Sequence, residues 1–386
     1  MPAARAKADT ESGTALPRAT SPPIGHATSH PSSLPSRGHI LIVAPSWVGD
    51  AILSEPLVAR LRSLEHVTRI DVLAPAWCAP VYARMRGIGR IFDSALGHGE
   101  VNLTQRRALA RTLSAEGYAR AIVLPNSWKS ALVPWLAGIP RRTGYTGEMR
   151  WGLINDSRRL DRKALPRLVD RYAALGVNRG DPAPPATAPV LVHDTQNRDA
   201  AVRALDLDLD RAVAILCPGA EFGPAKRWPA EHFANLARKF LAAGMHVWLL
   251  GSPNDKAAAA AVVAAMGDAR GATRDLSGQT DLGTAIDLLS LATIAVCNDS
   301  GLMHAAASVG APLVALFGSS SPAYTPPMSA AARIARIEIA CSPCFKRECP
   351  LGHFKCMRDL APDAVYDLAR ASLRSREAVA ESRPVS

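Results

Sequence analysis

The sequence predicts an α/β protein with two doubly wound, Rossmann-like domains that face each other across a cleft. Short apolar runs alternate with amphipathic stretches in two successive series, the pattern of βαβ units whose mainly parallel sheet is covered by helices. Each series opens with a strand that leads into a glycine-bearing turn. The length of 386 residues also favours two domains over one. Ligands of such sheets bind beyond the carboxyl ends of the strands, so we expect the functional residues there.

The two ends of the chain depart from this pattern. Residues 1–37 are rich in Ala, Pro, Ser and Thr and lack hydrophobic periodicity, so they bury too little surface to offset chain entropy. We expect them to form a disordered N-terminal extension. They contain no continuous apolar core, so we expect no secretory signal. Residues 376–386 are expected to form a flexible tail.

The first domain is expected over residues 38–190. Apolar runs predict its strands, and apolar residues three and four positions apart predict its helices. The predicted strands are 40–44, 69–74 and 121–125, and the predicted helices are 50–64 and 101–116. A Pro- and Ala-rich stretch, 181–189, is the expected linker, and a strand-like run at 189–192 follows it.

The second domain is expected over residues 191–375 and repeats the alternation. A helix near 197–205 comes first. The predicted strands are 212–217, 245–250, 293–297 and 312–317, and the predicted helices are 230–243, 255–266, 282–291 and 302–309.

The composition indicates an anionic partner. Lys and Arg number 45 against 34 Asp and Glu, a formal net charge of +11. Nucleic acid, an anionic membrane face, or a phosphorylated or carboxylated substrate would each suit this charge. Neither a ribonucleoprotein aromatic motif nor paired Cys/His finger spacing occurs, so we expect no nucleic-acid partner. No run approaches the ~20 apolar residues that cross a bilayer, so we expect a soluble or peripheral protein.

A candidate phosphate site follows the strand at 212–217. Pro218-Gly-Ala-Glu-Phe-Gly-Pro-Ala-Lys226-Arg227-Trp-Pro229 combines glycines with two cations just before a helix. Unpaired N–H groups and the positive end of a helix dipole beside Lys226 suit a phosphate or diphosphate. The alternative is an ordinary strand-to-helix turn with solvated basic residues.

Asp50 is the candidate general base. It lies at a helix start beyond the first strand, in Pro45-Ser-Trp-Val-Gly-Asp50. There it would accept a proton from a sugar hydroxyl, with Gly49 letting an acceptor approach the backbone. The alternative is an N-cap or first-turn carboxylate that interacts with the helix dipole.

Two further strand ends in the second half carry polar residues. Asp255, in Gly251-Ser-Pro-Asn-Asp255, is placed to contact ribose hydroxyls. The alternative is that Ser252 or Asn254 caps the next helix, and one set of residues can do both. Asn298-Asp-Ser-Gly-Leu-Met-His304 follows the next strand. Asp299 and Ser300 resemble an N-cap, Ser300 and Gly301 would offer free N–H groups, and His304 lies one turn on. A lone helix histidine is also often structural.

The cysteines form two groups. Cys78, Cys217 and Cys297 lie in or beside apolar runs and are expected to be core residues. The other four cysteines are close together in the sequence, and His353 lies between the last two: Cys341, Cys344, Cys349 and Cys356. Their spacings suit a structural zinc or iron site. The alternative is that they are free or redox-paired thiols. Residues Asp206 to Asp210 contain an Asp-x-Asp pattern, which is typical of a site for a divalent ion. The pattern precedes the predicted strand 212–217, so we expect it at the end of the sheet opposite the cleft.

Four ordered strings together resemble the ADP-heptose:lipopolysaccharide heptosyltransferases of glycosyltransferase family 9. The resemblance covers about residues 39–375. The strings are Pro45 to Asp50, Pro218 to Pro229, Asn298 to His304, and Cys341-Ser-Pro-Cys-Phe-Lys-Arg-Glu-Cys-Pro-Leu-Gly-His-Phe-Lys-Cys-Met357. The resemblance implies a GT-B fold and an inverting transfer that needs no metal or other cofactor.

The resemblance also implies the substrates. L-glycero-D-manno-heptose would move from its ADP-activated β form to the first heptose of heptosyl-Kdo2-lipid A. The enzyme would be cytoplasmic and peripheral on the anionic inner face of the inner membrane. Within the family, an enzyme that adds the first heptose, or one that modifies proteins, is the alternative; the loop before Asp50 and the four-cysteine run favour addition of the second heptose.

Site roles follow from the resemblance residue by residue. Asp50 matches the general base, Lys226 the cation on the donor phosphates, and Asp255 the ribose contact. Asp299 matches the carboxylate that holds the heptose, and the phosphate-side helix start matches Ser300, Gly301 and His304. The first-half cations Lys129, Arg141 and Arg142 are expected, with Gly49, to meet the acceptor. The family often has a hydroxyl residue in the loop before the lysine, but residues 220–223 of this chain are Ala-Glu-Phe-Gly. We therefore expect backbone amides, rather than a side-chain hydroxyl, to contact the phosphate there.

Two other classes of protein are alternatives. An NAD-dependent oxidoreductase on two Rossmann halves needs Gly-x-Gly-x-x-Gly after a strand, and neither glycine-bearing loop supplies it. A nucleotide-sugar-binding protein without turnover would keep the donor loops. Replacing Asp50 distinguishes an enzyme from such a binding protein. In an enzyme, the variant should still bind ADP-heptose but should no longer transfer the heptose.

Overall fold

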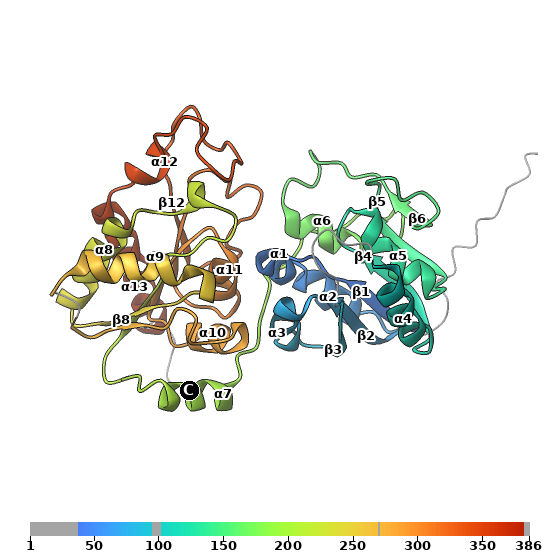
Figure 1. The fold of residues 1–386 in the computed structure, drawn as a ribbon, viewed down its shortest axis with the longest axis horizontal. Helices are drawn as coiled ribbons and strands as arrows, with labels where there is room; N and C mark the ends of the chain where they lie inside the picture. The colour runs from blue at the N-terminus through green and yellow to red at the C-terminus, as the bar shows by residue number, and fades with distance from the viewer. Residues whose placement is uncertain (1–37, 95–101, 269–270, 382–386) are drawn as a thin grey trace, which may run out of the picture. The chain divides into compact units, whose positions relative to one another are not determined.

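The computed structural model describes residues 38–94, 102–268 and 271–381 (Figure 1). The predicted disordered extension at 1–37 and residues 382–386 of the predicted tail lie outside the described residues. The expected α/β class is confirmed, because these residues form two sheets of six parallel strands with helices between the strands. None of the described helices is both long and apolar enough to cross a membrane.

The first sheet has the strand order β3-β2-β1-β4-β5-β6. Its strands are β1 (Gly38–Val43), β2 (Val67–Ala74), β3 (Ile88–Asp93), β4 (Tyr118–Val123), β5 (Arg141–Tyr145) and β6 (Asp156–Arg158). Side chains alternate across a strand, so Ile40 and Ile42 enter one core and Leu41 and Val43 enter another. Both faces are therefore buried, as a parallel sheet requires.

Helices cover both faces of this sheet. The Leu41 face packs on α4 (Leu103–Ser114) and α5 (Trp128–Leu136). The Ile40 face packs on α1 (Val48–Leu53), α2 (Glu55–Arg62), α3 (Ala79–Ala83) and α6 (Leu168–Ala174), and a short 3-10 turn, η1 (Ala76–Cys78), precedes α3.

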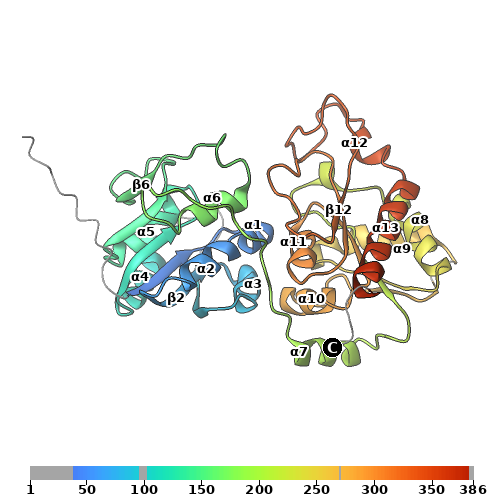
Figure 2. The ribbon, with the colours of Figure 1, turned by 180° about the vertical axis from the view of Figure 1, so that it is seen from behind.

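The second sheet repeats the topology with the order β12-β11-β10-β7-β8-β9. Its strands are β7 (Val213–Cys217), β8 (His246–Leu249), β9 (Thr273–Asp275), β10 (Ile294–Asn298), β11 (Leu313–Leu316) and β12 (Ala332–Ala335). One face is covered by α8 (Ala230–Ala242), α9 (Lys256–Met266) and α13 (Pro362–Glu381), which Figure 2 shows side by side. The other face is covered by α10 (Leu282–Leu289) and α11 (Gly301–Ser308), and α7 (Thr195–Ala204) packs on α10.

Several predicted elements differ from the structure. The run at 189–192 was wrongly predicted as a strand, because it lies in a segment without regular structure whose amides bond to scattered groups such as the Arg84 carbonyl. The predicted helix 50–64 is two helices that meet at Ser54, whose hydroxyl donates to the Ala51 carbonyl just before Pro56. Residues 376–381, expected in a tail, belong to α13.

Candidate active site

Three loops that follow central strands carry the candidate site. The loop after β1 leads to Asp50, the loop after β7 carries Lys226, and Asp299 follows β10 directly. In each sheet the strand order reverses beside the first strand, between β1 and β4 and between β7 and β10. Ligands of doubly wound sheets bind at these reversal points.

Lys226 and Asp299 form a buried ion pair. Lys226, at the end of the 3-10 turn η2 (Pro224–Lys226), places Nζ 2.5 Å from Oδ2 of Asp299 and 5.0 Å from the centre of the Phe222 ring. The Ser320 hydroxyl donates to the same oxygen. The Asp299 side chain is only 4% exposed. The pair therefore holds the ammonium group in a fixed orientation.

Asn298 and Arg347 fix the loop that carries Lys226. The Asn298 side chain accepts from the Trp228 amide (3.1 Å) and donates to the Pro218 carbonyl (2.8 Å), so it joins the two ends of the loop. Arg347 accepts from the Ala225 amide at 3.0 Å through its carbonyl. The Arg347 guanidinium also donates to the loop, through a 2.8 Å hydrogen bond to the Phe222 carbonyl. The loop is thus held before any ligand binds.

Asp50 lies in the first turn of α1 with a perturbed carboxyl group. Trp47, rather than Asp50, occupies the N-cap position, so of the two forms of the alternative only the first-turn carboxylate agrees with the structure. Burial raises the pKa of Asp50 to about 6, while Lys226 lowers it and Asp299 raises it. The carboxylate makes no hydrogen bond within the described residues. A free carboxylate that is mostly ionised at neutral pH, with a pKa near 6, suits a general base.

His304 is buried and neutral. Burial lowers its pKa to about 4, while Asp299 acts to raise it and Lys226 to lower it further. Gly49 lies against it: a Cβ on Gly49 would come within 2.9 Å of the imidazole Cδ2. A Cβ on Gly301 would come within 2.8 Å of the Val48 side chain. Both glycines therefore allow α1 and α11 to pack closely, which is a different reason for Gly49 from the expected approach of an acceptor.

Ser300 begins α11 without using its side chain. It occupies the N-cap, yet its hydroxyl makes no capping hydrogen bond to the helix. The hydroxyl and the first N–H groups of α11 are thus left for another partner.

Asp255 has one occupied and one unpartnered oxygen. Oδ2 accepts from the amide (2.9 Å) and hydroxyl (2.7 Å) of Ser252, so Ser252 occupies the N-cap, as one alternative expected, with Asp255 as its partner in a capping box. Oδ1 is buried and has no hydrogen-bond partner in the part of the chain that the structure describes. A Cβ on Gly219 would lie 2.1 Å from that oxygen, so only glycine fits there. Asp255 therefore caps a helix and still offers an acceptor to a ligand hydroxyl.

Three serines at this edge were not predicted from the sequence. Ser320 holds Asp299, and the buried hydroxyls of Ser277 and Ser319 have no partner among the described residues. Each serine follows a strand, β9 or β11, at its carboxyl end. That position is the signal that would have identified them.

The predicted acceptor cations lie in two places. Lys129 is in the first turn of α5, beyond β4, at the same edge of the sheet as Asp50. Arg141 and Arg142 instead begin β5, at the amino edge. Arg141 pairs with Asp156 at 3.0 Å, and Arg142 donates to the carbonyls of three residues, 139, 152 and 153. The structure does not bring these two arginines to the site.

The four clustered cysteines do not form a metal site in this structure. Cys341, Cys344, Cys349 and Cys356 line one small cavity with His353, and all four are free thiols. Hydrogen bonds from backbone amides, Phe354 first, lower the pKa of Cys349, and burial raises that of Cys356. Among residues 38–94, 102–268 and 271–381, no three His, Cys, Asp or Glu side chains are arranged to hold a metal ion. The expectation of zinc or iron is therefore unsupported.

The other cysteines and the Asp-x-Asp pattern have structural roles. Cys78, Cys217 and Cys297 are buried core residues, as predicted. Asp210, the last residue of the Asp-x-Asp pattern, lies 2.5 Å from Nε2 of His246 at the start of β8, at the amino edge of the sheet. This confirms that the pattern lies away from the candidate site.

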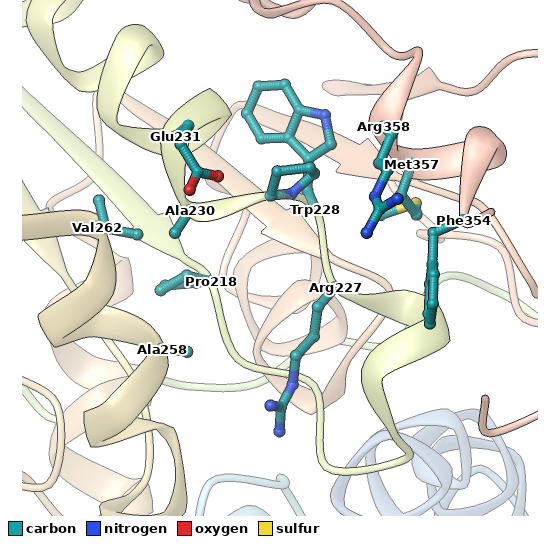
Figure 3. A pocket seen from close by; sticks show the side chains of 11 residues that line it. Pro218, Arg227, Trp228, Ala230, Glu231, Ala258, Val262, Phe354, Met357 and Arg358 are labelled. Carbon is teal, nitrogen blue, oxygen red and sulfur yellow. The ribbon is translucent and has the colours of Figure 1, made fainter. Parts of the chain in front are cut away.

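A cavity of about 400 Å³ lies behind the Lys226 loop (Figure 3). Its walls come from the loop and the first turn of α8, from α9 and from α12 (Lys355–Arg358) with the preceding residue. The side chains labelled in Figure 3 include Arg227, Trp228, Phe354 and Arg358, and none belongs to the candidate catalytic or donor residues. The titratable groups with perturbed pKa values, Asp50 and His304, are not among the residues that line this cavity.

Comparisons with known proteins agree with this geometry. Glycosyltransferase family 9 (heptosyltransferase) matches residues 106–355. The chain is 42% identical over 346 residues to lipopolysaccharide heptosyltransferase 2 of Escherichia coli strain K12, covering 88% of this chain and 99% of that protein. It is 41% identical over 309 residues to lipooligosaccharide heptosyltransferase 2 of Haemophilus influenzae, covering 78% and 88%.

The fold agrees as well. The solved structure of E. coli ADP-heptose LPS heptosyltransferase II superposes with a TM-score of 0.79 at 40% identity, covering 88% of this chain and 99% of that one. This confirms the GT-B fold expected from the resemblance. The chain belongs to glycosyltransferase family 9, the heptosyltransferases.

Proposed function

We propose that this glycosyltransferase moves L-glycero-D-manno-heptose from ADP-heptose to the first heptose of the Kdo-lipid A inner core, in lipopolysaccharide core synthesis. The observation that carries the proposal is an unpaired carboxylate, Asp50, with a pKa near 6 in the field of the Lys226 and Asp299 pair. The similarity to lipopolysaccharide and lipooligosaccharide heptosyltransferases 2 supports the reaction class and the sugar.

The second half would hold the donor. The Lys226 ammonium and the first N–H groups of α11, at Ser300 and Gly301, would bind the diphosphate. The unpartnered Oδ1 of Asp255 would accept a hydrogen bond from a ribose hydroxyl. Asp299 would hold the heptose hydroxyls through its carboxylate, which Ser320 positions.

The transfer would be a single displacement with inversion. The acceptor hydroxyl oxygen forms a bond to the anomeric carbon while the bond from that carbon to the diphosphate oxygen breaks. Asp50 receives the hydroxyl proton, and ADP leaves with the electron pair of the broken bond. Lys226 and the α11 amides offset the negative charge that develops on the diphosphate, so we propose that no metal is required. His304, buried and neutral, would donate or accept a hydrogen bond without adding charge.

Lys226 would exchange partners during the cycle. Its ammonium is paired with Asp299 in the structure, and a diphosphate would compete for it. The competition would free one Asp299 oxygen for a sugar hydroxyl as the donor enters. Binding of the nucleotide and orientation of the heptose would thus be linked through one ion pair.

The acceptor would reach the first half from the membrane. We propose that the enzyme acts at the inner face of the inner membrane as a peripheral protein, with Lys129 at the carboxyl edge of the first sheet near the acceptor. Residues 38–190 contain 21 Lys and Arg against 12 Asp and Glu, which suits the phosphates and carboxylates of a Kdo-lipid A acceptor.

The deciding experiment supplies two acceptors. Purified protein is incubated with ADP-heptose and either Kdo2-lipid A or its monoheptosylated form, and products are identified by mass spectrometry. We expect transfer only to the monoheptosylated acceptor. Preference for Kdo2-lipid A would instead assign addition of the first heptose. Binding of ADP-heptose with no product from either acceptor would indicate a non-catalytic binding protein.

Two further measurements test the mechanism. The anomeric configuration of the product by NMR should be opposite to that of the β-configured donor. The rate should be the same with and without a chelator such as EDTA, and a loss that added divalent ions restore would refute metal independence.

A further inference from the structure

One loop of the first half presents two large apolar side chains to solvent. It connects β5 to β6 over residues 146–155 and carries Met149 and Trp151. Met149 is 74% exposed and Trp151 is 81% exposed, higher values than for any other large apolar residue that the structure describes. Exposed apolar side chains of this size indicate a contact surface when the backbone is held in place.

The loop is held in place by two arginines. Arg150, between the two apolar residues, is only 3% exposed. Its guanidinium donates to the Pro125 carbonyl (2.6 Å), to Oδ1 of Asn126 (3.2 Å) and to the carbonyl of residue 145. Arg142 holds the other end of the loop through the carbonyls of residues 152 and 153. The exposure of Met149 and Trp151 is thus a consequence of a fixed backbone.

The loop begins at the functional edge of the sheet. Pro125 and Asn126 follow β4, and Arg150 ties the loop to them. Asp50 lies beyond β1, the neighbour of β4, so it is at the same carboxyl edge. The loop and the proposed general base therefore lie at the same edge of the first sheet.

Cations accompany the apolar pair. Arg159, Arg162 and Lys163 follow β6 at the same edge and are exposed, and they outnumber the exposed acids Glu148 and Asp161. Across the whole first half, basic residues outnumber acidic ones by 21 to 12. Over residues 191–386 the two kinds are equal, at 20 each. The partner of this edge should therefore be anionic as well as apolar.

We propose that Met149 and Trp151 insert into the interface of an anionic lipid bilayer while Arg159, Arg162 and Lys163 contact its headgroups. Tryptophan prefers the boundary between headgroups and acyl chains, and basic residues near an anionic leaflet add attraction. A few apolar side chains with cations give reversible binding, which suits an enzyme that must leave one lipid acceptor for the next. The inference rests on the membrane part of the proposed function.

Vesicle binding tests this surface. The full chain is sedimented with vesicles of phosphatidylcholine and phosphatidylglycerol in equal parts, and with vesicles of phosphatidylcholine alone. The test variant is Met149→Ser with Trp151→Ser. The matched control is Leu209→Ser with Leu351→Ser, which removes two apolar side chains exposed by 49% and 61% in the second half. A third variant changes Arg159, Arg162 and Lys163 to Gln.

The expected results separate the apolar and charged parts. The wild-type chain and the control should bind the mixed vesicles equally, and the Met149 and Trp151 variant at least about tenfold more weakly. The Gln variant should lose its preference for phosphatidylglycerol. Equal vesicle binding by all variants would overturn the proposal. So would loss of self-association, measured by analytical ultracentrifugation, in the Met149 and Trp151 variant, since the surface would then join two protein copies.

A water-soluble acceptor separates this inference from the proposed function. Transfer to the deacylated heptosyl-Kdo acceptor should be unchanged in the Met149 and Trp151 variant, because the catalytic groups are intact. If the wild-type chain fails to use that acceptor but binds vesicles through this loop, the proposed function fails and the membrane surface stands. If transfer proceeds and vesicle binding does not depend on the loop, the reverse holds.

Discussion

The two halves of the molecule share a strand order but distribute charge differently. In each sheet the first strand lies beside the fourth, and the loops beyond these strands carry the candidate site. The first half has a basic surplus, and its carboxylate Asp50 makes no hydrogen bond within the described residues. The second half is balanced in charge, and its carboxylate Asp299 is bound to Lys226 and Ser320.

This difference teaches how one fold gives two carboxylates different tasks. Asp50 is perturbed by burial, so its pKa rises towards the range where it exchanges protons at neutral pH. Asp299 is paired with a cation and a hydroxyl, so it orients groups instead. We propose that the positive net charge of the first half attracts the anionic acceptor.

The largest expected effect comes from the first half. Replacing Asp50 by Asn removes the proton acceptor while keeping the shape of the side chain, so transfer should fall about 10²- to 10⁴-fold. Affinity for ADP-heptose, measured by calorimetry, should stay within about twofold, since the donor contacts lie in the other half. A full retained rate would remove Asp50 from the role of base.

The next largest effect should come from Lys226. Changing it to Met removes the ammonium from the diphosphate, so both the rate and donor affinity should fall, the rate by about 10²- to 10³-fold. Arg227→Met is the matched control, because this neighbouring cation is exposed and its guanidinium makes one long contact, 3.5 Å to the Ala220 carbonyl. Equal losses in the two variants would show that general basicity, rather than the Lys226 position, binds the donor.

A smaller effect should separate the two roles of Asp255. Asp255→Ala should weaken ADP binding about 10- to 100-fold by removing the free Oδ1 from the ribose. Asp281→Ala removes a similar helix cap, the hydrogen bond from the Thr284 amide to Oδ1 at 2.7 Å, outside the site. Both variants should lose about 1 kcal/mol of unfolding free energy. Unchanged ADP affinity in Asp255→Ala would leave that residue a structural cap.

The smallest effect concerns stability. Because burial raises the pKa of Asp50 to about 6, the folded state holds a proton that the unfolded state releases above about pH 4. The free energy of unfolding is therefore higher at low pH, and this contribution of Asp50 is lost as pH rises through 6. The free energy of unfolding of Asp50→Asn should therefore exceed that of the wild type by about 1–2 kcal/mol at pH 8. At pH 4 the two values should be equal. Denaturant titration at the two values measures this, and equal curves at pH 8 would contradict the burial of Asp50.

The sequence predicted the strands that are continuously buried and missed the short strands that carry charged residues. The central strands β1, β7 and β10 are uninterrupted apolar runs, so their positions and the loops beyond them were predictable. The strands that were missed, β3, β5, β6, β9 and β12, are short or carry charged residues: each contains arginine or aspartate. Charge on a short strand looks the same in sequence as charge in a loop; four of the missed strands are edge strands, and β5 lies next to one.

The site shows the same division. The sequence identified Asp50, Lys226, Asp255 and Asp299 as strand-end residues, but the contact between Lys226 and Asp299 joins residues 73 positions apart and has no local signature. Arg141 and Arg142 were expected at the acceptor because their charge was visible. Their partners, Asp156 and backbone carbonyls, became apparent only in the folded chain.

The pH dependence of transfer tests most directly whether Asp50 is the general base while the second half binds the donor. With the monoheptosylated acceptor, kcat/KM of the wild-type chain should rise tenfold per pH unit up to about pH 6 and then level, since protonated Asp50 cannot accept a proton. Donor affinity measured over the same range should stay constant. The residual rate of Asp50→Asn should lack this rise. A rise near pH 6 that persists in Asp50→Asn, or that follows donor affinity in the wild-type chain, would contradict the account.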